Sequence, residues 1–329
     1  MAQPLRLAVV GAGHMGRFHA QAIAERPDAD LVAVCDIDQG RARSLADEHG
    51  AEAVTAAADL AGRVDAAVVA ASTSAHEAVA GALADQGTPM LIEKPLAGTA
   101  EEARRIADAA RRAGVLVQVG HILRFDPVTR AVAACPLPDP VYIEVLWVAP
   151  FSFRSMDVGV VMDLMIHGLD VVLDLAGHMP TEVHAAGGVV VGPHEDVVNV
   201  RLGFPGGCVA IVSASRLSRA RYRLVRVFAE GVYVKMDYGE RRAEVLRPGR
   251  DLRRRLEEGT LAGAGIEDLV STEAIPVEAE PDALRAQLAA FLDAVRTGAE
   301  PPVTLDDGVR AVELADRILD EIQPSANDE

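Results

Sequence analysis

The chain has 329 residues, half of them apolar, and a formal net charge of −17 at pH 7. This length provides ample core for one large domain or two ordinary domains. The negative charge argues against a nucleic-acid or anionic-membrane surface, because both partners are polyanions that repel a negative protein at long range.

Three cysteines and the first residues narrow the class further. Cys35, Cys135 and Cys208 lie far apart, without the CxxC spacing of zinc or redox sites, so we expect free thiols. The N-terminal residues lead straight into an apolar strand, without a basic region followed by a long apolar stretch, and no apolar run is long enough to span a bilayer. We therefore expect a cytoplasmic protein.

The first 120 residues alternate short apolar runs with helical stretches rich in Ala, Arg and Glu. The runs have the length and the Val, Leu and Ile content of buried strands. They are residues 5–10, 30–36, 64–72, 88–94 and 115–120. This alternation predicts a Rossmann-type, doubly wound parallel sheet, which we assign to a domain of residues 1–121.

The pattern changes after residue 121. An apolar helix at about 158–176 is followed by strand-like runs without helices between them, at 181–191, 196–204, 208–216, 223–230 and 232–238. Consecutive strands predict a large, mostly antiparallel sheet in an α+β domain of residues 122–329. We expect the charged, Gly-bearing region 247–280 to be a surface excursion, and two amphipathic helices at about 281–297 and 305–321 to close the chain.

A glycine-rich loop joins the first strand to the first helix. Gly11, Gly13 and Gly16 form the pattern GxGxxG. The first glycine makes a tight turn, the second lets the backbone approach a pyrophosphate, and the third lets the helix pack on the strand. The loop predicts a dinucleotide site; the alternative is an ordinary glycine turn that binds nothing.

Asp36 lies at the end of the second strand, twenty residues after Gly16. A carboxylate there accepts hydrogen bonds from the ribose 2′-hydroxyl of NAD and repels the 2′-phosphate of NADP. Arg41 and Arg43 follow closely and soften this preference. We expect NAD as the cofactor.

The apolar helix at 158–176 carries a polar stripe. Asp163 and His167 lie four residues apart and share a face, which Asp170 and Asp174 continue. The stripe is either a solvated edge or a face directed into a pocket, where a carboxylate and an imidazole carry out acid–base chemistry. Metal binding would need further ligands, and no HExxH-like set is present, so we expect no metal site.

Lys94 is one of only two lysines, because every other basic residue except Lys235 is arginine. It follows an apolar strand within the sequence Glu93-Lys94-Pro95. A chain that favours arginine so strongly has reason to keep a lysine where a compact ammonium does what a guanidinium fork cannot. The alternatives are an accident of composition and a proline that merely ends a strand.

The glycine loop, the Glu93-Lys94-Pro95 motif and the Asp163-x-x-x-His167 motif together resemble the glucose–fructose oxidoreductase, inositol dehydrogenase and MocA (Gfo/Idh/MocA) family, over nearly the whole chain. The resemblance implies that Lys94, Asp163 and His167 form a catalytic triad. In that role the ammonium of Lys94 donates to the reacting hydroxyl and stabilises its developing alkoxide.

The resemblance also implies cofactor and substrate residues. Ser72, Thr73 and His76 are similar to a Pro-Thr-x-x-His segment beside the nicotinamide, with Ser72 in place of the proline. The expected cofactor-binding residues are Gly11, Gly13, His14, Met15, Gly16, Asp36, Ile37, Ser72, Thr73, His76, Glu93 and Lys94. The substrate-site candidates are His121, Arg124, Trp147, Phe151, Asp163 and His167. The first two of these could instead mark a domain linker, and Trp147 and Phe151 could be core residues.

The sequences GHILRFDP and DLMIHGLD are similar to a subgroup often assigned to UDP-N-acetylglucosamine 3-dehydrogenases and related nucleotide-sugar oxidoreductases, with Gly168 in place of a usual aspartate. The leading hypothesis is an NAD-dependent dehydrogenase that oxidises a secondary hydroxyl of a sugar, cyclitol or nucleotide sugar, with His167 as the base. The alternatives are a dinucleotide-binding regulator without turnover and a reductase of other carbonyls or imines.

The expected antiparallel sheet also bears on assembly. In the strand at 208–216, Ala210 and Val212 point to one face and Val209 and Ile211 to the other, so neither face favours solvent. We expect one face of the sheet to pack on the helix that carries Asp163, and the other face to be covered by a partner subunit. We expect a homodimer or homotetramer that forms through this sheet, as the family resemblance also implies.

Overall fold

The computed structural model describes residues 3–151, 158–249, 252–260, 265, 269–279 and 282–322. The chain forms two compact units. Unit 1 comprises Met1–Phe125 and Asp282–Asp316, and unit 2 comprises Asp126–Pro281 and Arg317–Glu329. Within the described ranges, no helix combines the length and the apolar content needed to cross a bilayer. The three cysteines are free thiols, as expected.

Unit 1 contains a six-stranded parallel sheet in the order β3-β2-β1-β4-β5-β6. This is the strand order of a Rossmann fold, and it confirms the predicted doubly wound sheet. The strands are β1 (Leu5–Val10), β2 (Ala29–Cys35), β3 (Glu52–Val54), β4 (Ala66–Val69), β5 (Met90–Glu93) and β6 (Val117–Gly120). The sequence patterns missed β3, because three residues are too few to show a period.

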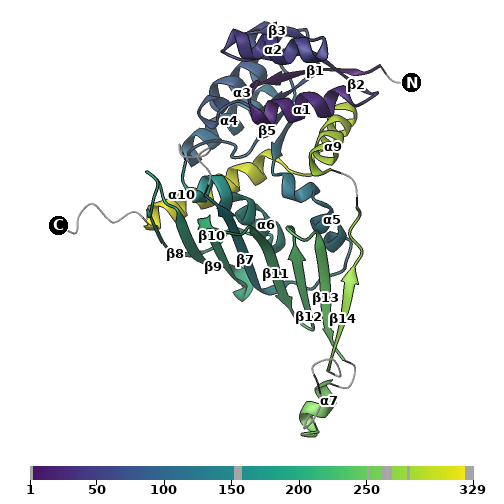
Figure 1. Cartoon of the computed structure of the whole chain (residues 1–329), viewed down its shortest axis with the longest axis vertical. Coiled ribbons are helices and arrows are strands. Elements are labelled where there is room, and N and C mark those ends of the chain that lie inside the picture. The colour runs from purple at the N-terminus through teal and green to yellow at the C-terminus, as the bar shows by residue number, and fades with distance from the viewer. Residues whose placement is uncertain are drawn as a thin grey trace, which may run out of the picture. The chain divides into compact units, whose positions relative to one another are not determined.

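Helices cover this sheet. They are α1 (His14–Ala24), α2 (Gln39–His49), α3 (His76–Asp85), α4 (Ala100–Ala113) and α9 (Ala283–Thr297), with short 3-10 turns η1 (Ala57–Leu60), η2 (Thr73–Ala75) and η3 (Ile122–Phe125). Leu288 and Phe291 of α9 are fully buried in one cluster with Leu7 of β1 and Ile23 of α1. Figure 1 shows α1 and α9 side by side, so a late segment of the chain completes the first core.

Unit 2 contains an eight-stranded sheet in the order β14-β13-β12-β11-β7-β10-β9-β8 (Figure 1). Its strands are β7 (Pro140–Pro150), β8 (Glu182–Gly188), β9 (Val197–Gly203), β10 (Val209–Ser218), β11 (Tyr222–Ala229), β12 (Val232–Asp237), β13 (Arg242–Pro248) and β14 (Val270–Ile275). Neighbouring strands are antiparallel except for β7 and β10, which pair in parallel. The predicted mostly antiparallel sheet is therefore confirmed.

Three strands of this sheet were not among the predicted runs, namely β7, β13 and β14. The interpretation of residues 247–280 as a surface excursion is wrong for residues 270–275, which form the edge strand β14. An edge strand has one neighbour, and four of the six residues of β14 are exposed, so it lacks the apolar pattern of a buried strand. The same region also contains α7 (Leu252–Glu257).

Helical segments pack on one face of this sheet. They are α5 (Pro127–Ala133), the π-helical turn η5 (Val161–Met165) and α6 (Ile166–Ala176). The burial of β10 alternates accordingly: Ala210 and Val212 are buried, and Val209 and Ile211 are half-buried. The predicted assignment of these four residues to two faces is confirmed. A 3-10 turn, η6 (Pro205–Gly207), links β9 to β10, and α10 (Leu305–Ile322) ends the described chain.

A buried ion pair anchors the start of η5. The guanidinium of Arg216 on β10 donates to the Asp196 carboxylate over 2.6 Å and to the Val158 carbonyl oxygen over 2.9 Å. The second carboxylate oxygen accepts the backbone N–H groups of Val190, Val191 and Gly192 at 2.7, 2.6 and 3.0 Å. One carboxylate therefore fixes both the loop between β8 and β9 and the entry to η5.

The neighbouring Glu195 completes this anchor. Its carbonyl oxygen accepts the N–H of Val160 at 3.0 Å, and its carboxylate accepts the N–H of Val161 at 3.1 Å. Burial alone would raise the pKa of the Asp196 carboxyl, but the backbone N–H groups and Arg216 outweigh burial and lower that pKa. A lowered pKa means that the ionised carboxylate stabilises the folded state above the unfolded-state pKa of about 3.9.

We expect Asp196→Ala to lower the free energy of unfolding by about 3–5 kcal/mol at neutral pH, because it leaves the buried Arg216 unpaired. The deficit should shrink as the pH falls below about 4, where the wild-type carboxylate loses its contribution. Urea unfolding at several pH values measures both effects. Asp139→Ala, at an exposed position of the same unit, should change stability by less than about 0.5 kcal/mol. A deficit in Asp196→Ala as small as in this control would contradict the anchor.

Candidate active site

The backbone around the glycine-rich loop is packed so closely that two of its glycines have no room for a side chain. Gly11 has a φ of +106°, and a Cβ atom there would lie 2.5 Å from the backbone of Ala70. A Cβ atom on Gly16 would lie 1.8 Å from the Gly11 carbonyl oxygen. Around Gly13, in contrast, a Cβ atom would meet nothing within 4 Å. The loop thus needs glycine at 11 and 16 to close, and it borders open space at 13.

The helix that follows this loop has an open N-terminus. Gly13 is the N-cap of α1 and makes no side-chain cap, and the first turn contains no acidic residue. Neither the N-cap residue nor an acidic side chain of the first turn therefore accepts the first N–H groups of α1. These N–H groups suit an anion such as a pyrophosphate. The glycine loop and α1 together fit a bound dinucleotide.

A cleft of about 460 Å³ opens beside this loop in unit 1. Its walls include five of the predicted cofactor-binding residues, namely Gly11, Gly13, Asp36, Ile37 and Ser72. Ile37 has 89% of its surface exposed, which is unusual for so large an apolar side chain. Next to the carboxylate of Asp36, it offers an apolar surface on which an adenine ring can rest.

The Asp36 carboxylate is nearly buried at the wall of this cleft. One of its oxygens accepts the Ala12 N–H at 2.8 Å. The other accepts the Asp38 N–H at 2.9 Å and the guanidinium of Arg41 at 3.0 Å. A carboxylate has about four lone-pair positions, so it retains capacity for a ribose hydroxyl. Arg41 partly compensates its charge and would place a cation beside a ribose that binds there.

Three other predicted cofactor residues lie on the same segments. His14 is exposed, and its ring meets Phe18 edge to face with centroids 4.7 Å apart. Met15 is half-buried and packs against the core cluster of unit 1. Thr73 is half-buried and begins the short turn η2.

His76 is almost fully buried and connects two backbone segments. Its Nδ1 lies 3.1 Å from the carbonyl oxygens of both Pro95 and Leu96, and its Nε2 lies 3.2 Å from that of Ala71. Burial lowers the pKa of the imidazole, and these carbonyl oxygens oppose the effect only in part. If His76 contributes to cofactor binding, it does so by fixing the backbone segments that its ring contacts, at Ala71 and at Pro95 and Leu96.

Lys94 is half-buried and follows β5, with a cis peptide bond to Pro95. The preceding Glu93 is buried, and its carboxylate lies 2.7 Å from Nε2 of His19 on α1 and accepts the Lys94 N–H at 3.3 Å. A Cβ atom on Gly120 would lie only 2.8 Å from the Glu93 Cα, so β6 leaves no spare room. These contacts connect the helix of the glycine loop to the residue before Lys94.

His19 was not predicted as a site residue, although the sequence contains a signal for it. It lies on the face of α1 that buries Ala20 and Ile23, and Glu93 ends an apolar strand. A buried polar side chain needs a partner, so two polar residues at buried positions of neighbouring elements indicate a pair.

Asp163 and His167 lie at the start of the helical segment in unit 2. Asp163 belongs to the π-helical turn η5, His167 belongs to the first turn of α6, and both are half-buried. Asp170 is buried and Asp174 is exposed. Only the far end of the stripe, at Asp174, is fully exposed, so the stripe is not simply a solvated edge. Asp163 also lies in a π-helical turn, and such turns are frequent at functional sites.

The four remaining substrate candidates differ in burial. In unit 1, His121 is buried, and the Arg124 guanidinium lies 3.9 Å from the Asp307 carboxylate. In unit 2, Phe151 is half-buried, and Trp147 is 2% exposed within the core. Trp147 therefore presents no open face to a sugar in this structure.

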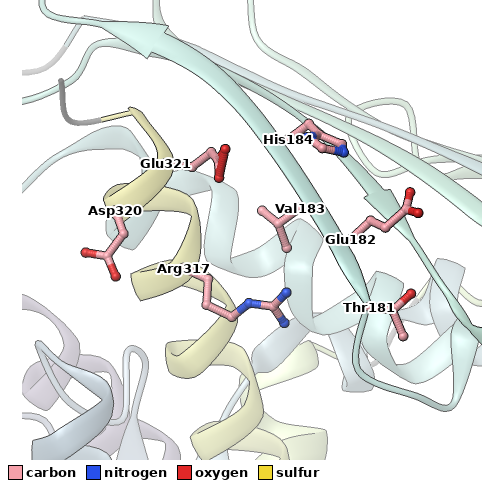
Figure 2. Close-up of a pocket in the computed structure, with 7 residues that line it drawn as sticks. All are labelled: Thr181, Glu182, Val183, His184, Arg317, Asp320 and Glu321. Carbon is pink, nitrogen blue, oxygen red and sulfur yellow. The ribbon is translucent and has the colours of Figure 1, made fainter. Parts of the chain in front are cut away.

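A separate hollow of about 820 Å³ lies between β8 and the end of α10 (Figure 2). It is lined by Thr181, Glu182, Val183, His184, Arg317, Asp320 and Glu321. Arg317 donates to the Pro180 carbonyl oxygen over 3.0 Å. The lining mixes acids and bases and contains no predicted site residue, so we do not assign the active site to it.

Family models match the chain in two parts. An oxidoreductase family model with an NAD-binding Rossmann fold matches residues 5–121, and the Gfo/Idh/MocA C-terminal domain model matches residues 145–245. Together they cover more than half of the chain. The chain belongs to the Gfo/Idh/MocA oxidoreductase family. Unit 1 carries its NAD-binding domain, which confirms the predicted cofactor.

Individual relatives agree with this membership. The UDP-N-acetylglucosamine 3-dehydrogenase of Acidithiobacillus ferrooxidans is 34% identical over 92% of this chain and 91% of its own length. Its solved structure has a TM-score of 0.88 and covers 98% of each chain. The inositol 2-dehydrogenase of Rhizobium meliloti is 29% identical over 95% of each chain. The protein is therefore an NAD-dependent dehydrogenase of the Gfo/Idh/MocA family.

The contacts of Asp36 generate a prediction about cofactor choice. We expect the wild-type enzyme to bind NAD more tightly than NADP, because the Asp36 carboxylate repels a 2′-phosphate. Asp36→Ala should reduce the difference between the two affinities, since it removes that repulsion and also removes the carboxylate to which Arg41 donates. Adding Arg41→Ala should weaken NADP binding again by about ten- to a hundredfold, the value of a charge-assisted hydrogen bond.

Titration calorimetry with both cofactors measures these affinities. Arg43→Ala is the matched control, because Arg43 is an exposed arginine on the same helix, α2, whereas Arg41 is the arginine that lines the cleft and donates to Asp36. Equal affinities for NAD and NADP in the wild-type protein would refute the role of Asp36.

Proposed function

We propose that this enzyme oxidises a secondary hydroxyl of a sugar, cyclitol or nucleotide sugar to a ketone. The observation that carries the proposal is the similarity, along nearly the whole chain, to a relative named as a UDP-N-acetylglucosamine 3-dehydrogenase. Inositol dehydrogenases among the relatives support the same class of reaction, oxidation of a ring hydroxyl. Our first candidate substrate is UDP-N-acetylglucosamine, oxidised at C3.

The proposed reaction assigns one role to each residue of the predicted triad. NAD, when bound, supplies the acceptor for the hydride that leaves the carbinol carbon. His167 takes the hydroxyl proton as general base, so that the carbon–oxygen bond becomes a carbonyl. The ammonium of Lys94 donates to the oxygen while negative charge develops on it, and Asp163 orients the site.

The surroundings of these residues support their roles. Glu93 places a buried carboxylate immediately before Lys94, and the contact with His19 fixes that carboxylate. Asp163 and His167 follow directly from the anchored start of η5, so their backbone position is well determined. Two half-buried titratable groups on one short segment are suited to proton transfer.

The decisive measurement is turnover with a panel of sugars, cyclitols and UDP-sugars, followed through formation of reduced cofactor. We expect Lys94→Arg to lower kcat by about a hundredfold or more, because a guanidinium cannot place one compact donor at the reacting oxygen. Lys235→Arg changes the only other lysine, which lies on β12, and should retain wild-type activity. Near-normal activity of Lys94→Arg would refute the role of Lys94. Intact NAD binding without turnover of any substrate would instead indicate a regulator.

We also propose that the enzyme forms a homodimer or homotetramer through the face of the sheet opposite α6. On this face Tyr142, Phe228 and Tyr233 form an aromatic cluster, with ring centroids 5.7 and 4.7 Å apart in successive pairs. A salt bridge of 3.1 Å joins Glu144 to Arg226 beside them. A contiguous apolar patch rimmed by charges is typical of a subunit interface, and a contact between two copies of one sheet face is isologous.

Light scattering at micromolar concentration, below and above physiological salt, tests this assembly. We expect a dimeric or tetrameric mass in the wild-type protein and a smaller mass in Phe228→Glu, because the substitution would bury a charge within the cluster. Leu256→Glu makes the same kind of change at an exposed apolar residue of α7 and should leave the mass unchanged. A strictly monomeric wild-type protein at both salt concentrations would contradict the proposal.

A further inference from the structure

The proposed base lies against the only tryptophan of the chain. The rings of Trp147 and His167 are stacked, with centroids 5.9 Å apart and planes inclined by 29°. Trp147 belongs to β7 and His167 to α6, so the stack crosses the boundary between the sheet and the helix of unit 2. Both residues come from the same unit.

The helix comes close enough for this stack because a glycine follows His167. A Cβ atom on Gly168 would lie 2.7 Å from Cγ1 of Val145 on β7. Val145 and Trp147 are two residues apart on one strand and point to the same face of the sheet. The approach of α6 at Gly168 therefore brings the imidazole of His167 down to the indole.

The indole is itself held from other sides. Arg223 is the register partner of Trp147 on β11, and its guanidinium carbon lies 5.5 Å from the ring centroid. The ring of Tyr238 lies 5.6 Å from the indole at an angle of 59°, and its hydroxyl is 2.9 Å from Oγ1 of Thr129. Trp147 is 2% exposed. It is thus a fixed surface beneath the imidazole and not a group that reaches a substrate.

We propose that Trp147 is a positioning residue that sets the ring plane of His167, an inference that rests on the proposed function for its catalytic consequence. A stack within about 6 Å restricts the rotation of an imidazole and attracts the imidazolium that forms after proton transfer. The permanent charge of Arg223 on the same indole opposes that attraction. Orientation, rather than basicity, is therefore the main contribution of the stack.

Steady-state kinetics on the holoenzyme test the catalytic consequence. Trp147→Phe keeps an aromatic face and should retain kcat within about threefold, whereas Trp147→Leu should lose about ten- to a hundredfold in kcat, the effect of misplacing a reacting group by about 1 Å. The KM for substrate and the Kd for NAD should stay within about twofold in both variants. Val227→Ala makes a cavity on the same buried face, at β11, and controls for loss of packing.

Tryptophan fluorescence tests the stack itself and needs no substrate. An imidazolium stacked on an indole quenches the indole fluorescence, because the excited indole transfers an electron to an imidazolium more readily than to a neutral imidazole. Emission of wild-type protein should therefore rise in one step as the pH increases through the range where histidines ionise. Other ionisable groups around the stack include Asp163, Asp170, Asp174, Arg216, Arg223, Tyr238 and Asp126, while Tyr142, Glu144 and Arg226 lie on the opposite face of the sheet. Carboxyls, phenols and guanidinium groups ordinarily ionise outside that range.

The two measurements separate the possible failures. His167→Asn should abolish the fluorescence step, and a step that persists in this variant, or is absent from the wild-type protein, overturns the stack. Trp147→Leu with wild-type kcat, or Trp147→Phe as impaired as Trp147→Leu, overturns the positioning role. If no substrate of the panel is turned over, the proposed function fails, and the fluorescence step still decides whether the indole holds the imidazole.

Discussion

Close approach of one backbone segment to another is the constraint on which both units depend. The dinucleotide turn of unit 1 closes only because Gly11 and Gly16 have no side chains, and Gly120 leaves just enough room for Glu93. In unit 2, Gly168 lets α6 lie directly against β7. Protein interiors are packed like organic crystals, so a methyl group at these positions would have to displace neighbouring atoms. These glycines, which have no reactive side chain, therefore set the positions of the residues that are proposed to react.

Buried polar contacts then connect segments that are distant in the sequence. His19 connects α1 to the end of β5 through Glu93. His76 connects the segment after β4 to the segment after β5. In unit 2, Asp196 and Arg216 connect the loop before β9 to the start of η5. A buried polar group that loses its partner costs stability, so each contact fixes the separation of the elements that it connects.

The sequence predicts unit 1 better than unit 2 for a physical reason. Parallel strands buried on both faces appear as continuous apolar runs, and the glycine turn and Asp36 have fixed spacings from them. Strand β7 pairs in parallel with β10, some sixty residues later, and β14 is a polar edge strand. Pairs such as Trp147 with His167 depend on three-dimensional register, which local periodicity does not contain. The triad residues came from family resemblance, and their burial and contacts came only from the structure.

The loop between β8 and β9 shows that a carboxylate can fix the backbone path of a loop without fixing its exposed side chains. Asp196 holds this loop through backbone N–H groups, which every residue except proline provides. The side chains of Val190 and Val191 are exposed and take no part in the anchor. Among the three residues whose N–H groups the Asp196 carboxylate accepts, Gly192 is restricted, because a Cβ atom there would lie 2.7 Å from the guanidinium of Arg216. Evolution can therefore diversify the side chains at positions 190 and 191, and a laboratory library can randomise these two positions, while the backbone that leads to the proposed base keeps its path.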